Sequence, residues 1–532
     1  MYRSSILRYT VLFLSVFIFM VSKPIFALTI DIHRVSVSST GEQANEASGV
    51  ATLSADGRYI VFDSLASNLV ADDTNGVYDV FVHDIQTATT TRVSVSSTGQ
   101  EANATSGSHA ISADGRYIVF GSNASNLVAN DTNGVSDYFL RDMQTGTITR
   151  ITLSSVGVEA NSFSDDVSIS GDGRYIAFSS RASNLVPNDT NDEQDVFVHD
   201  MQTGMTTRED VTSTGQQTAS GGNRPVISQD GRYIAFIAGD LIPSDTNGLD
   251  DIYVRDLQTG INQVATLSST GDSIDIGTAN YPSISAHGRF VAFFSDATNL
   301  VPDDTNGQPD VFVRDMQADT TTRVNVSTQG AQTNYGWSWS YPSALSSDGR
   351  FVTFQAGADN LVPNDTNGLF DVFVHDMQTG ITARMSLGYN GAQAHGEIAA
   401  LSPDGRFVGF QSPIANLVPN DTNNNLDVFV TVNTLFPVTT ANASPIINYY
   451  AQMPFTLTWN SVSWATGYEV EIATTRDFGA SVISSFTTAA DELQTAVSSI
   501  RNGHFYWRVR AQNAAGTPAT WGTIYSFDVN SS

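Results

Sequence analysis

The chain has 532 residues, which is long for one ordinary domain, and 41% of them are hydrophobic, which is enough for a sizeable core. Only 15% are charged and the formal net charge at pH 7 is −29, so nucleic acids and anionic membranes are poor partners, whereas divalent cations are attracted. The absence of cysteine excludes disulfides, thiolate catalysis and cysteine-ligated zinc.

The first 27 residues have the pattern of a secretory signal peptide. Arg3 and Arg8 precede an apolar core of about residues 11–21, and Ala27 is a small residue at the expected cleavage position. The apolar run is short for a membrane span. We expect export and cleavage, which leave a secreted or cell-envelope protein without a membrane span. Retention of the segment as an anchor is the alternative.

A repeat occupies about residues 28–434. Its marker is Asp-Gly-Arg, or a close variant, followed by an aromatic residue. In the second repeat, Ser108–Ser112, Tyr117–Ser122 and Asp137–Asp142 predict strands, and "TITRITLSS" predicts a fourth. Asp-Gly is a favoured pair for the hairpin turn. Four antiparallel strands without a helix describe one blade of a β-propeller. The marker glycines are Gly57, Gly115, Gly173, Gly231, Gly288, Gly349 and Gly405.

The last repeat stops after its third strand, which lies in Asp427–Thr434. A close match to the missing fourth strand stands before the first repeat, at Asp31–Thr40. Pairing of this segment with the last repeat would leave no open sheet edge in the ring. The sequence therefore predicts an all-β fold with a seven-bladed β-propeller closed by the N-terminal strand.

The repeats resemble those of TolB-type propellers. The resemblance rests on "SPDGRFVGF" at Ser402–Phe410 and "DIYVRDLQTG" at Asp251–Gly260, and the repeats cover about three quarters of the chain. It implies the propeller fold and leaves the role open, because this fold carries many functions.

Residues 435–446 predict a linker, and residues 447–532 predict a β-sandwich. This last segment resembles a fibronectin type III module. Trp459 would be its early core tryptophan, and Tyr468 and the strand Tyr506–Asn513 fit its later strands. The resemblance implies a module that spaces or attaches the propeller and indicates no ligand.

The loop between the second and third strands repeats as Asp-Thr-Asn-Gly-x-x-Asp. Two carboxylates and an amide carbonyl are hard oxygen ligands, and glycine permits the turn, as in calcium loops of the D-x-[DN]-x-[DN]-G type. The loop resembles the calcium loops of integrin-type propeller blades and dockerins, which implies calcium sites. The candidate metal ligands are Asp73, Asn75, Asp79, Asp131, Asn133, Asp137, Asp189, Asn191, Asp195, Asp245, Asn247, Asp251, Asp304, Asn306, Asp310, Asp365, Asn367, Asp371, Asp421, Asn423 and Asp427.

A purely structural turn is the competing interpretation of this loop. Where a calcium loop has its first Asp, the sequence has Ala or Pro, as at Ala71 and Pro363. A site would therefore need another ligand, such as Asn68 or Asn360, and would bind calcium weakly. Asp and Asn side chains also stabilise turns without any metal.

Other repeated residues indicate structural roles. The arginine of each Asp-Gly-Arg, such as Arg58, is expected to pair with a neighbouring acid or carbonyl. His83, His199 and His375 share a strand position with arginines in other repeats, which indicates a surface or pairing position rather than a ligand.

The sixth repeat departs from the others in the loop before its first strand. Clustered aromatic side chains in a Gly/Ser loop can stack on sugars, anchor a protein partner, or fill the gap between blades. The candidate ligand-binding residues are Tyr281, Tyr335, Trp337, Trp339 and Tyr341.

No catalytic motif is present, and no set of three residues assembles from spacing alone. His109, His395, Asp165, Asp166 and Glu397 stand where they could face the central channel. We expect an exported, non-catalytic, monomeric binding protein whose top face takes a protein or glycan, with calcium as a possible cofactor. The alternatives are an extracellular carbohydrate-active enzyme, lyase or hydrolase, and a cell-envelope scaffold without a small ligand.

Overall fold

The computed structural model describes residues 32–239, 241–334 and 344–436, and parts of the segment between residues 450 and 529. The predicted signal segment, Trp459 and the aromatic residues Tyr335 to Tyr341 lie outside the described residues. All regular elements that the structure describes are β-strands. None of these residues belongs to a helix that could cross a membrane.

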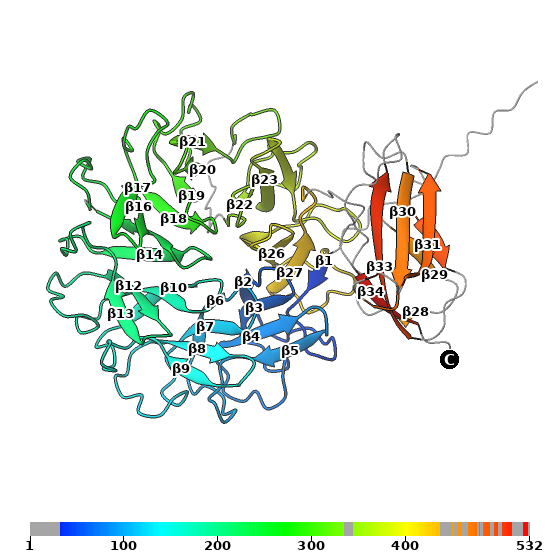
Figure 1. Ribbon diagram of the computed structural model, residues 1–532, viewed down its shortest axis with the longest axis horizontal. Helices are drawn as coiled ribbons and strands as arrows, with labels where there is room; N and C mark the ends of the chain where they lie inside the picture. The colour runs from blue at the N-terminus through cyan, green and yellow to red at the C-terminus, as the bar shows by residue number, and fades with distance from the viewer. Residues whose placement is uncertain are drawn as a thin grey trace, which may run out of the picture.

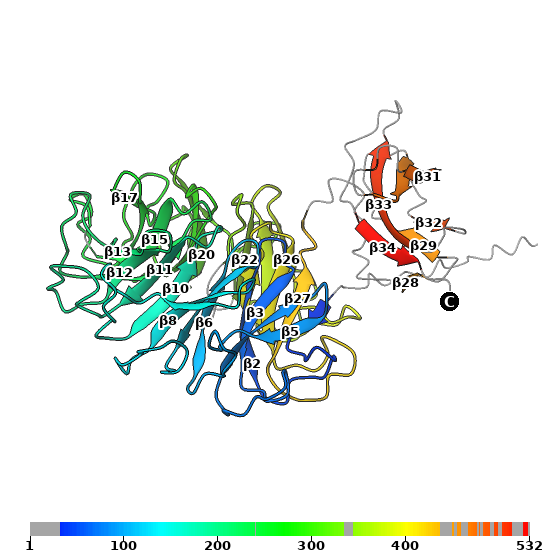
Figure 2. The ribbon, with the colours of Figure 1, turned by 60° about the horizontal axis from the view of Figure 1, so that its bottom comes forward.

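Residues 32–436 form repeated antiparallel sheets, which follow one another around a ring (Figure 1, Figure 2). Numbered first to seventh in chain order, they are β2 (Ser48–Leu53), β3 (Tyr59–Ser64), β4 (Asp79–Asp84) and β5 (Thr89–Arg92); β6 (Ser106–Ile111), β7 (Tyr117–Ser122), β8 (Asp137–Asp142) and β9 (Ile148–Arg150); β10 (Ser164–Ile169), β11 (Tyr175–Ser180), β12 (Asp195–Asp200) and β13 (Met205–Arg208); β14 (Gly222–Ile227), β15 (Tyr233–Ala238), β16 (Asp251–Asp256) and β17 (Ile261–Val264); β18 (Ala279–Ile284), β19 (Phe290–Ser295), β20 (Asp310–Asp315) and β21 (Thr320–Arg323); β22 (Phe351–Ala356), β23 (Asp371–Asp376) and β24 (Ile381–Arg384); and β25 (Glu397–Leu401), β26 (Phe407–Ser412) and β27 (Asp427–Val432) with β1 (Ile32–Arg34).

The N-terminal strand belongs to the last of these sheets. β1 pairs antiparallel with β27, so that Ile32 lies opposite Thr431 and Arg34 lies opposite Phe429. Segments at the two ends of the repeat region therefore form one four-stranded sheet, in the order β1-β27-β26-β25. This is the pairing expected for Asp31–Thr40 and the last repeat.

The core lies between consecutive sheets, because both faces of each sheet are apolar. Val61 and Val80 of the first sheet pack with Ile118 and Phe120 of the second, and all four side chains are fully buried. Aromatic rings also pair across the middle strands, as in Phe120 and Phe139 at 6.0 Å. Burial of apolar area on both faces is the main stabilising contribution to this arrangement.

A circle of backbone hydrogen bonds joins the turns that follow the first strands. Each bond runs from one turn to the corresponding turn of the next sheet, over 2.7–3.3 Å. Asp404 of the seventh sheet donates to Ala55 of the first, which completes the circle. We call this end the turn face; the acidic loops lie at the other end of the strands, the loop face. The donors are Ala55, Ala113, Gly171, Asp230, Ala286, Ser347 and Asp404.

The Asp-Gly-Arg turns also hold neighbouring sheets together. Gly115 has a φ of +75°, and a Cβ there would lie 2.2 Å from the ring of Tyr59 in the preceding sheet, so only glycine fits. Arg116 makes a bidentate ion pair with Asp142 at 3.0 and 2.8 Å. The expected pairing of these arginines is confirmed. In the seventh sheet the arginine, Arg406, pairs with Asp404 of its own turn.

The C-terminal segment contains two further sheets. The larger has the order β28 (Tyr450–Ala451), β34 (Tyr525–Val529), β33 (Gly503–Gln512), β30 (Gly467–Ala473) and β31 (Val482–Ala489), and β29 (Phe455–Thr458) pairs with β32 (Gln494–Val497). Tyr468 and Trp507 are buried. The fibronectin type III assignment stays a prediction.

Candidate functional site

The acidic loop of the first sheet encloses an arginine of the same sheet. Nη1 of Arg92, on the outer strand β5, lies 3.3 Å from Asp73, 3.2 Å from Asp79 and 3.0 Å from Glu101. Asp79 also accepts a hydrogen bond from Ser94. The two loop carboxylates therefore receive an internal cation and a hydroxyl donor.

The same arrangement recurs in six of the seven sheets. In each, Nη1 of the arginine lies 2.9–3.3 Å from both loop carboxylates, and its side chain is 7–9% exposed. Burial alone disfavours the charged carboxylates and raises the pKa of Asp371 to about 6, against the attraction of Arg384. The arginines are Arg34, Arg92, Arg150, Arg208, Arg323 and Arg384.

The fourth sheet lacks this arginine. Val264 stands in its place, opposite Tyr253, where the other sheets pair an arginine with a phenylalanine. The Tyr253 hydroxyl donates to Asp245, while the other carboxylate oxygen of Asp245 is buried without a hydrogen-bond partner. Burial raises the pKa of the neighbouring Asp251 to about 6. In this sheet the hydroxyl of Tyr253 takes the place of the guanidinium, and it donates to only one oxygen of Asp245.

The six arginine-containing loops do not fit a calcium ion. A cation between their two carboxylates would have to displace the guanidinium that already lies there. The loop asparagine is engaged as well, because the amide of Asn75 donates to Asp79 and to the Ala102 carbonyl. Within the described ranges, no three acidic or histidine side chains gather in a way that suits a metal. Calcium binding stays a prediction, and the fourth loop is the one where no arginine competes.

The asparagine that precedes six of the loops, considered above as an extra ligand, bonds a backbone carbonyl of the preceding connection instead. Asn68 donates to the Gln43 carbonyl and accepts from the backbone of Asn45. The acidic loops are thereby fixed to the connection that arrives from the previous sheet. The histidines of the third strands also have structural partners: His83 is buried, bonds Thr90 at 2.9 Å, and has a pKa lowered by burial to about 4.

The first strands of the sheets carry a second repeated feature, which sequence patterns did not reveal. Six of them contain a bulge with a non-glycine residue at a φ of 42–54°, near the loop face. Such conformations are strained and cluster at functional sites. First strands of consecutive sheets contact one another, for example β6 with β10 and β10 with β14, so the bulges follow the inside of the ring. The bulge residues are Val50, Ser108, Asp166, Arg224, Tyr281 and Ile398.

Three consecutive bulge residues contact one another. The backbone N–H of Arg224 donates to Asp166 Oδ2 at 3.3 Å, and the Arg224 guanidinium lies 4.0 Å from the centre of the Tyr281 ring. Asp166 is exposed, and Arg224 and Tyr281 are half-buried. Of the predicted ligand-binding residues, Tyr281 is the one that the structure describes, and it lies in this group.

The two histidines predicted to face the channel each lie near a carboxylate, His109 near Asp63 and His395 near Glu397. His109 Nε2 is 4.0 Å from Asp63, and both atoms are otherwise without a hydrogen-bond partner. Burial disfavours the charged form of each group, so it lowers the pKa of His109 to about 4 and raises that of Asp63 to about 6. His395 Nε2 is 3.1 Å from Glu397, in the seventh sheet.

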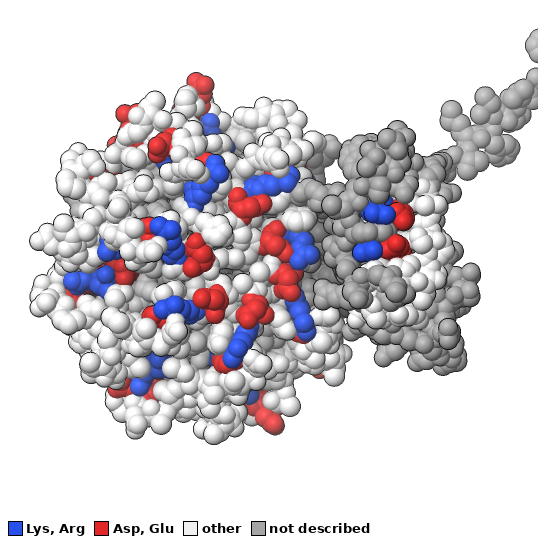
Figure 3. All heavy atoms as spheres, viewed as in Figure 1, with Lys and Arg blue, Asp and Glu red and all other residues white. Residues whose placement is uncertain are grey.

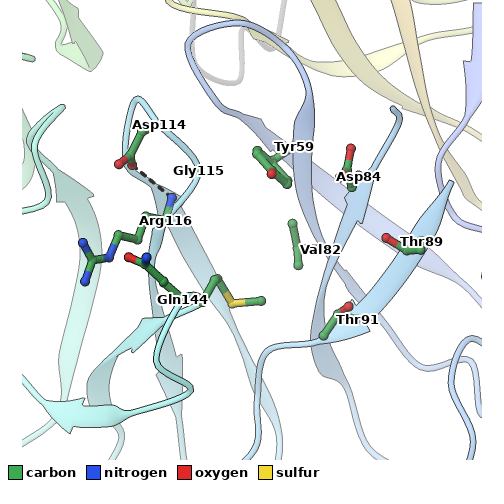
Figure 4. Close-up of a pocket in the computed structure, with 10 residues that line it drawn as sticks. Tyr59, Val82, Asp84, Thr89, Thr91, Asp114, Gly115, Arg116 and Gln144 are labelled. Atoms are coloured by element: carbon green, nitrogen blue, oxygen red, sulfur yellow. Dashed lines mark hydrogen bonds between the residues drawn. The ribbon is translucent and has the colours of Figure 1, made fainter. Parts of the chain in front are cut away.

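Grooves open between sheets at the turn face. One, of about 440 Å³, is lined by Tyr59, Asp84 and Thr89 of the first sheet and by Asp114 and Arg116 of the second (Figure 4). The corresponding groove between the fifth and sixth sheets has about 690 Å³ and the equivalent lining residues. Arg116 already pairs with Asp142, and its backbone N–H donates to Asp114. Because its charged groups are internally paired, this groove is a weaker candidate than the bulges.

The charge on the face shown in Figure 3 alternates in sign around the centre of the ring. Basic side chains stand beside acidic ones, and neither sign forms a broad patch. Short ion pairs are a general feature of the chain, such as Arg58–Asp84 at 2.6 Å and Arg174–Asp200 at 2.8 Å. The face shown therefore has no basic patch of the kind that nucleic acids require.

No protein-family model and no curated protein sequence matches the chain. Among solved structures, it is similar to TolB from Agrobacterium tumefaciens (15% identity over 76% of this chain and 97% of that one, TM-score 0.34). It is also similar to the β-propeller domain of the Trilobed protease from Pyrococcus furiosus (13% identity over 74% of this chain and 94% of that one, TM-score 0.45). A third similar structure is that of the WD40 repeats of RRP9 (10% identity over 76% of this chain and 98% of that one, TM-score 0.37). Similarities at this level carry no functional conclusion, and the propeller-type fold follows from the strand pairing of the chain itself.

Proposed function

We propose that this protein is an exported, non-catalytic binding protein built on a closed seven-bladed propeller. The inner bulges at the loop face take a protein or glycan partner. Tyr335, Trp337, Trp339 and Tyr341, which lie outside the described residues, are proposed to contribute to the same binding role. The C-terminal module spaces or attaches the propeller, and the protein acts as a monomer in the cell envelope or outside the cell.

One observation carries the proposal: the bulges repeat in backbone but not in chemistry. The acidic loops and the turns keep nearly the same residues from sheet to sheet, because they hold the sheets together. The bulge positions share a strained conformation, yet they present an aliphatic, a hydroxyl, an acidic, a basic and an aromatic side chain. Varied side chains on a fixed scaffold are the arrangement that recognition of one asymmetric partner requires.

Single substitutions at the bulges test the proposal. The second sheet has serine at this position, Ser108, with the same kind of positive φ. Changing Asp166 or Tyr281 to serine therefore introduces a residue that the fold already accepts in this backbone conformation. Binding to a glycan array or to an identified protein partner is expected to fall at least tenfold, with the melting temperature retained. Arg289→Gln, at the turn face, is the matched control and is expected to bind normally. Normal binding by every bulge variant would refute the proposal.

An extracellular carbohydrate-active enzyme is the second candidate. The His395–Glu397 contact favours it, because a carboxylate 3.1 Å from an imidazole is the geometry of an acid–base pair. Glu397→Gln would then abolish the appearance of reducing or unsaturated ends from polysaccharides. Binding without turnover, in the native protein and in this variant alike, is the result that the binding proposal predicts.

We propose a calcium site only at the fourth acidic loop, where no arginine lies between the carboxylates. Val264→Arg would place a guanidinium between Asp245 and Asp251, as in the other sheets. Calcium is expected to raise the melting temperature of the chelator-treated native protein slightly and to have no effect on this variant, which should itself be more stable. A calcium response of equal size in both proteins would assign the ion to another place.

A further inference from the structure

Almost every arginine in the described part of the chain has an internal anionic or carbonyl partner. Eighteen of the twenty arginines there form ion pairs with carboxylates. Arg141 donates to the carbonyls of Val95 and Ser96. Because acidic residues outnumber basic ones in this chain, 54 to 25, each arginine is expected to find an internal acidic partner. An arginine without one is therefore a candidate for binding a ligand.

Arg224 is the exception among these residues. Its guanidinium lies over the Tyr281 ring, 4.0 Å from the ring centre, and no carboxylate or carbonyl of the described chain accepts from it. The residue also holds a φ of 52° and lies on a first strand, at the inside of the ring with the other bulges. The aromatic ring orients the planar guanidinium and leaves its donor edge for another group.

We propose that Arg224 binds the carboxylate of an acidic sugar, a uronate unit within a glycan. This inference rests on the binding role proposed above and names the ligand class of the same site. A fixed guanidinium presents two parallel donors, which match the two oxygens of a carboxylate. A neutral sugar has no carboxylate, so it cannot form this ion pair with Arg224.

The surroundings favour a saccharide over an acidic peptide. Asp165 and Asp166 are exposed beside Arg224, and carboxylates accept hydrogen bonds from sugar hydroxyls. A peptide offers few hydroxyls, and a segment rich in acidic residues would be repelled by these two aspartates and by the net charge of −29. The site therefore fits a glycan with sparse carboxylates better than a polyanion.

Calorimetry with matched trisaccharides tests the inference. One carries a single glucuronate, the second has glucose in its place, and an acidic tripeptide is the third probe. The native full-length protein is expected to bind the glucuronate sugar at least tenfold more tightly than the neutral one. Arg224→Gln should remove that preference, and Arg224→Lys should keep part of it, because the charge remains and the fork is lost. Arg289→Gln should behave as the native protein does.

The other outcomes overturn the inference in distinguishable ways. Equal affinity for the charged and neutral sugars, with binding that depends on Tyr281, would leave the binding role standing and remove the uronate. Preference for the tripeptide would replace the ligand class. Absence of binding by all three probes would overturn the inference, while the binding role would still be tested by the array and the bulge variants. A glucuronate preference retained in Arg224→Gln would place the carboxylate elsewhere.

Discussion

Replacing Arg150 by valine is expected to lower the free energy of unfolding by about 3–5 kcal/mol, the cost of breaking a buried ion pair from one side. Nη1 of Arg150 lies 3.2 Å from Asp131, 3.3 Å from Asp137 and 2.6 Å from Glu159. Without it, two buried carboxylates face each other in a medium that solvates them poorly. Urea unfolding followed by circular dichroism measures the loss.

The fourth sheet supplies a rescue for this variant. There, valine coexists with a tyrosine whose hydroxyl donates to the loop. The double variant Phe139→Tyr, Arg150→Val is therefore expected to recover part of the lost stability. The control Arg116→Val removes a partly exposed ion pair, which solvent screens, and should cost much less than Arg150→Val. An Arg150→Val loss as small as that of the control would contradict the role assigned to the acidic loops.

Replacing Asp210 by asparagine is expected to stabilise the protein by about 1–3 kcal/mol at neutral pH, the usual penalty of a buried unsatisfied polar group. Asp210 is 1% exposed, and neither of its carboxylate oxygens has a donor. It lies beside the loop carboxylate of Asp195, so a hydrogen bond forms only when one of the two is protonated. The other six sheets have a donor here: Ser36, Ser94, Thr152, Thr266, Asn325 and Ser386.

The gain from Asp210→Asn is expected to depend on pH. Burial, with the Asp195 charge, raises the pKa of Asp210 well above its ordinary value. The folded state therefore holds a proton that the unfolded state releases, and stability is lost as pH rises from the ordinary carboxyl range. The difference between variant and native protein should widen from pH 4 to pH 8. The reciprocal change Asn325→Asp should lose stability over the same range. A gap that stays constant with pH would contradict this account.

The fold follows from the sequence wherever local signals repeat. β7 and β8 have the bounds that the second repeat predicts, because Asp-Gly-Arg and the acidic loop mark both ends of each strand. The fourth strand is shorter than predicted and ends at Arg150. The chain then turns into a small hairpin, with Leu153 bridged to Glu159, which the alternating pattern of "TITRITLSS" does not distinguish from a strand.

The candidate sites were less accessible to sequence reasoning. The arginine partners of the acidic loops are visible in the sequence as a repeated residue of the fourth strand. The loop pattern alone suggests a metal, because the arginine stands 13 to 19 residues away in five sheets and at the other end of the repeat region, as Arg34, in the seventh. The bulges give no pattern at all, since Asp166, Arg224 and Tyr281 share a backbone conformation and no residue type. Their side-by-side placement is a property of the ring.

A crystal structure of the complex with a glucuronate-containing trisaccharide is the decisive measurement. We expect the sugar at the loop-face end of the first strands, with its carboxylate within hydrogen-bond distance of Arg224 and its ring near Tyr281. A sugar bound in the turn-face groove beside Asp84 and Arg116, or on the outer strands, would contradict this prediction.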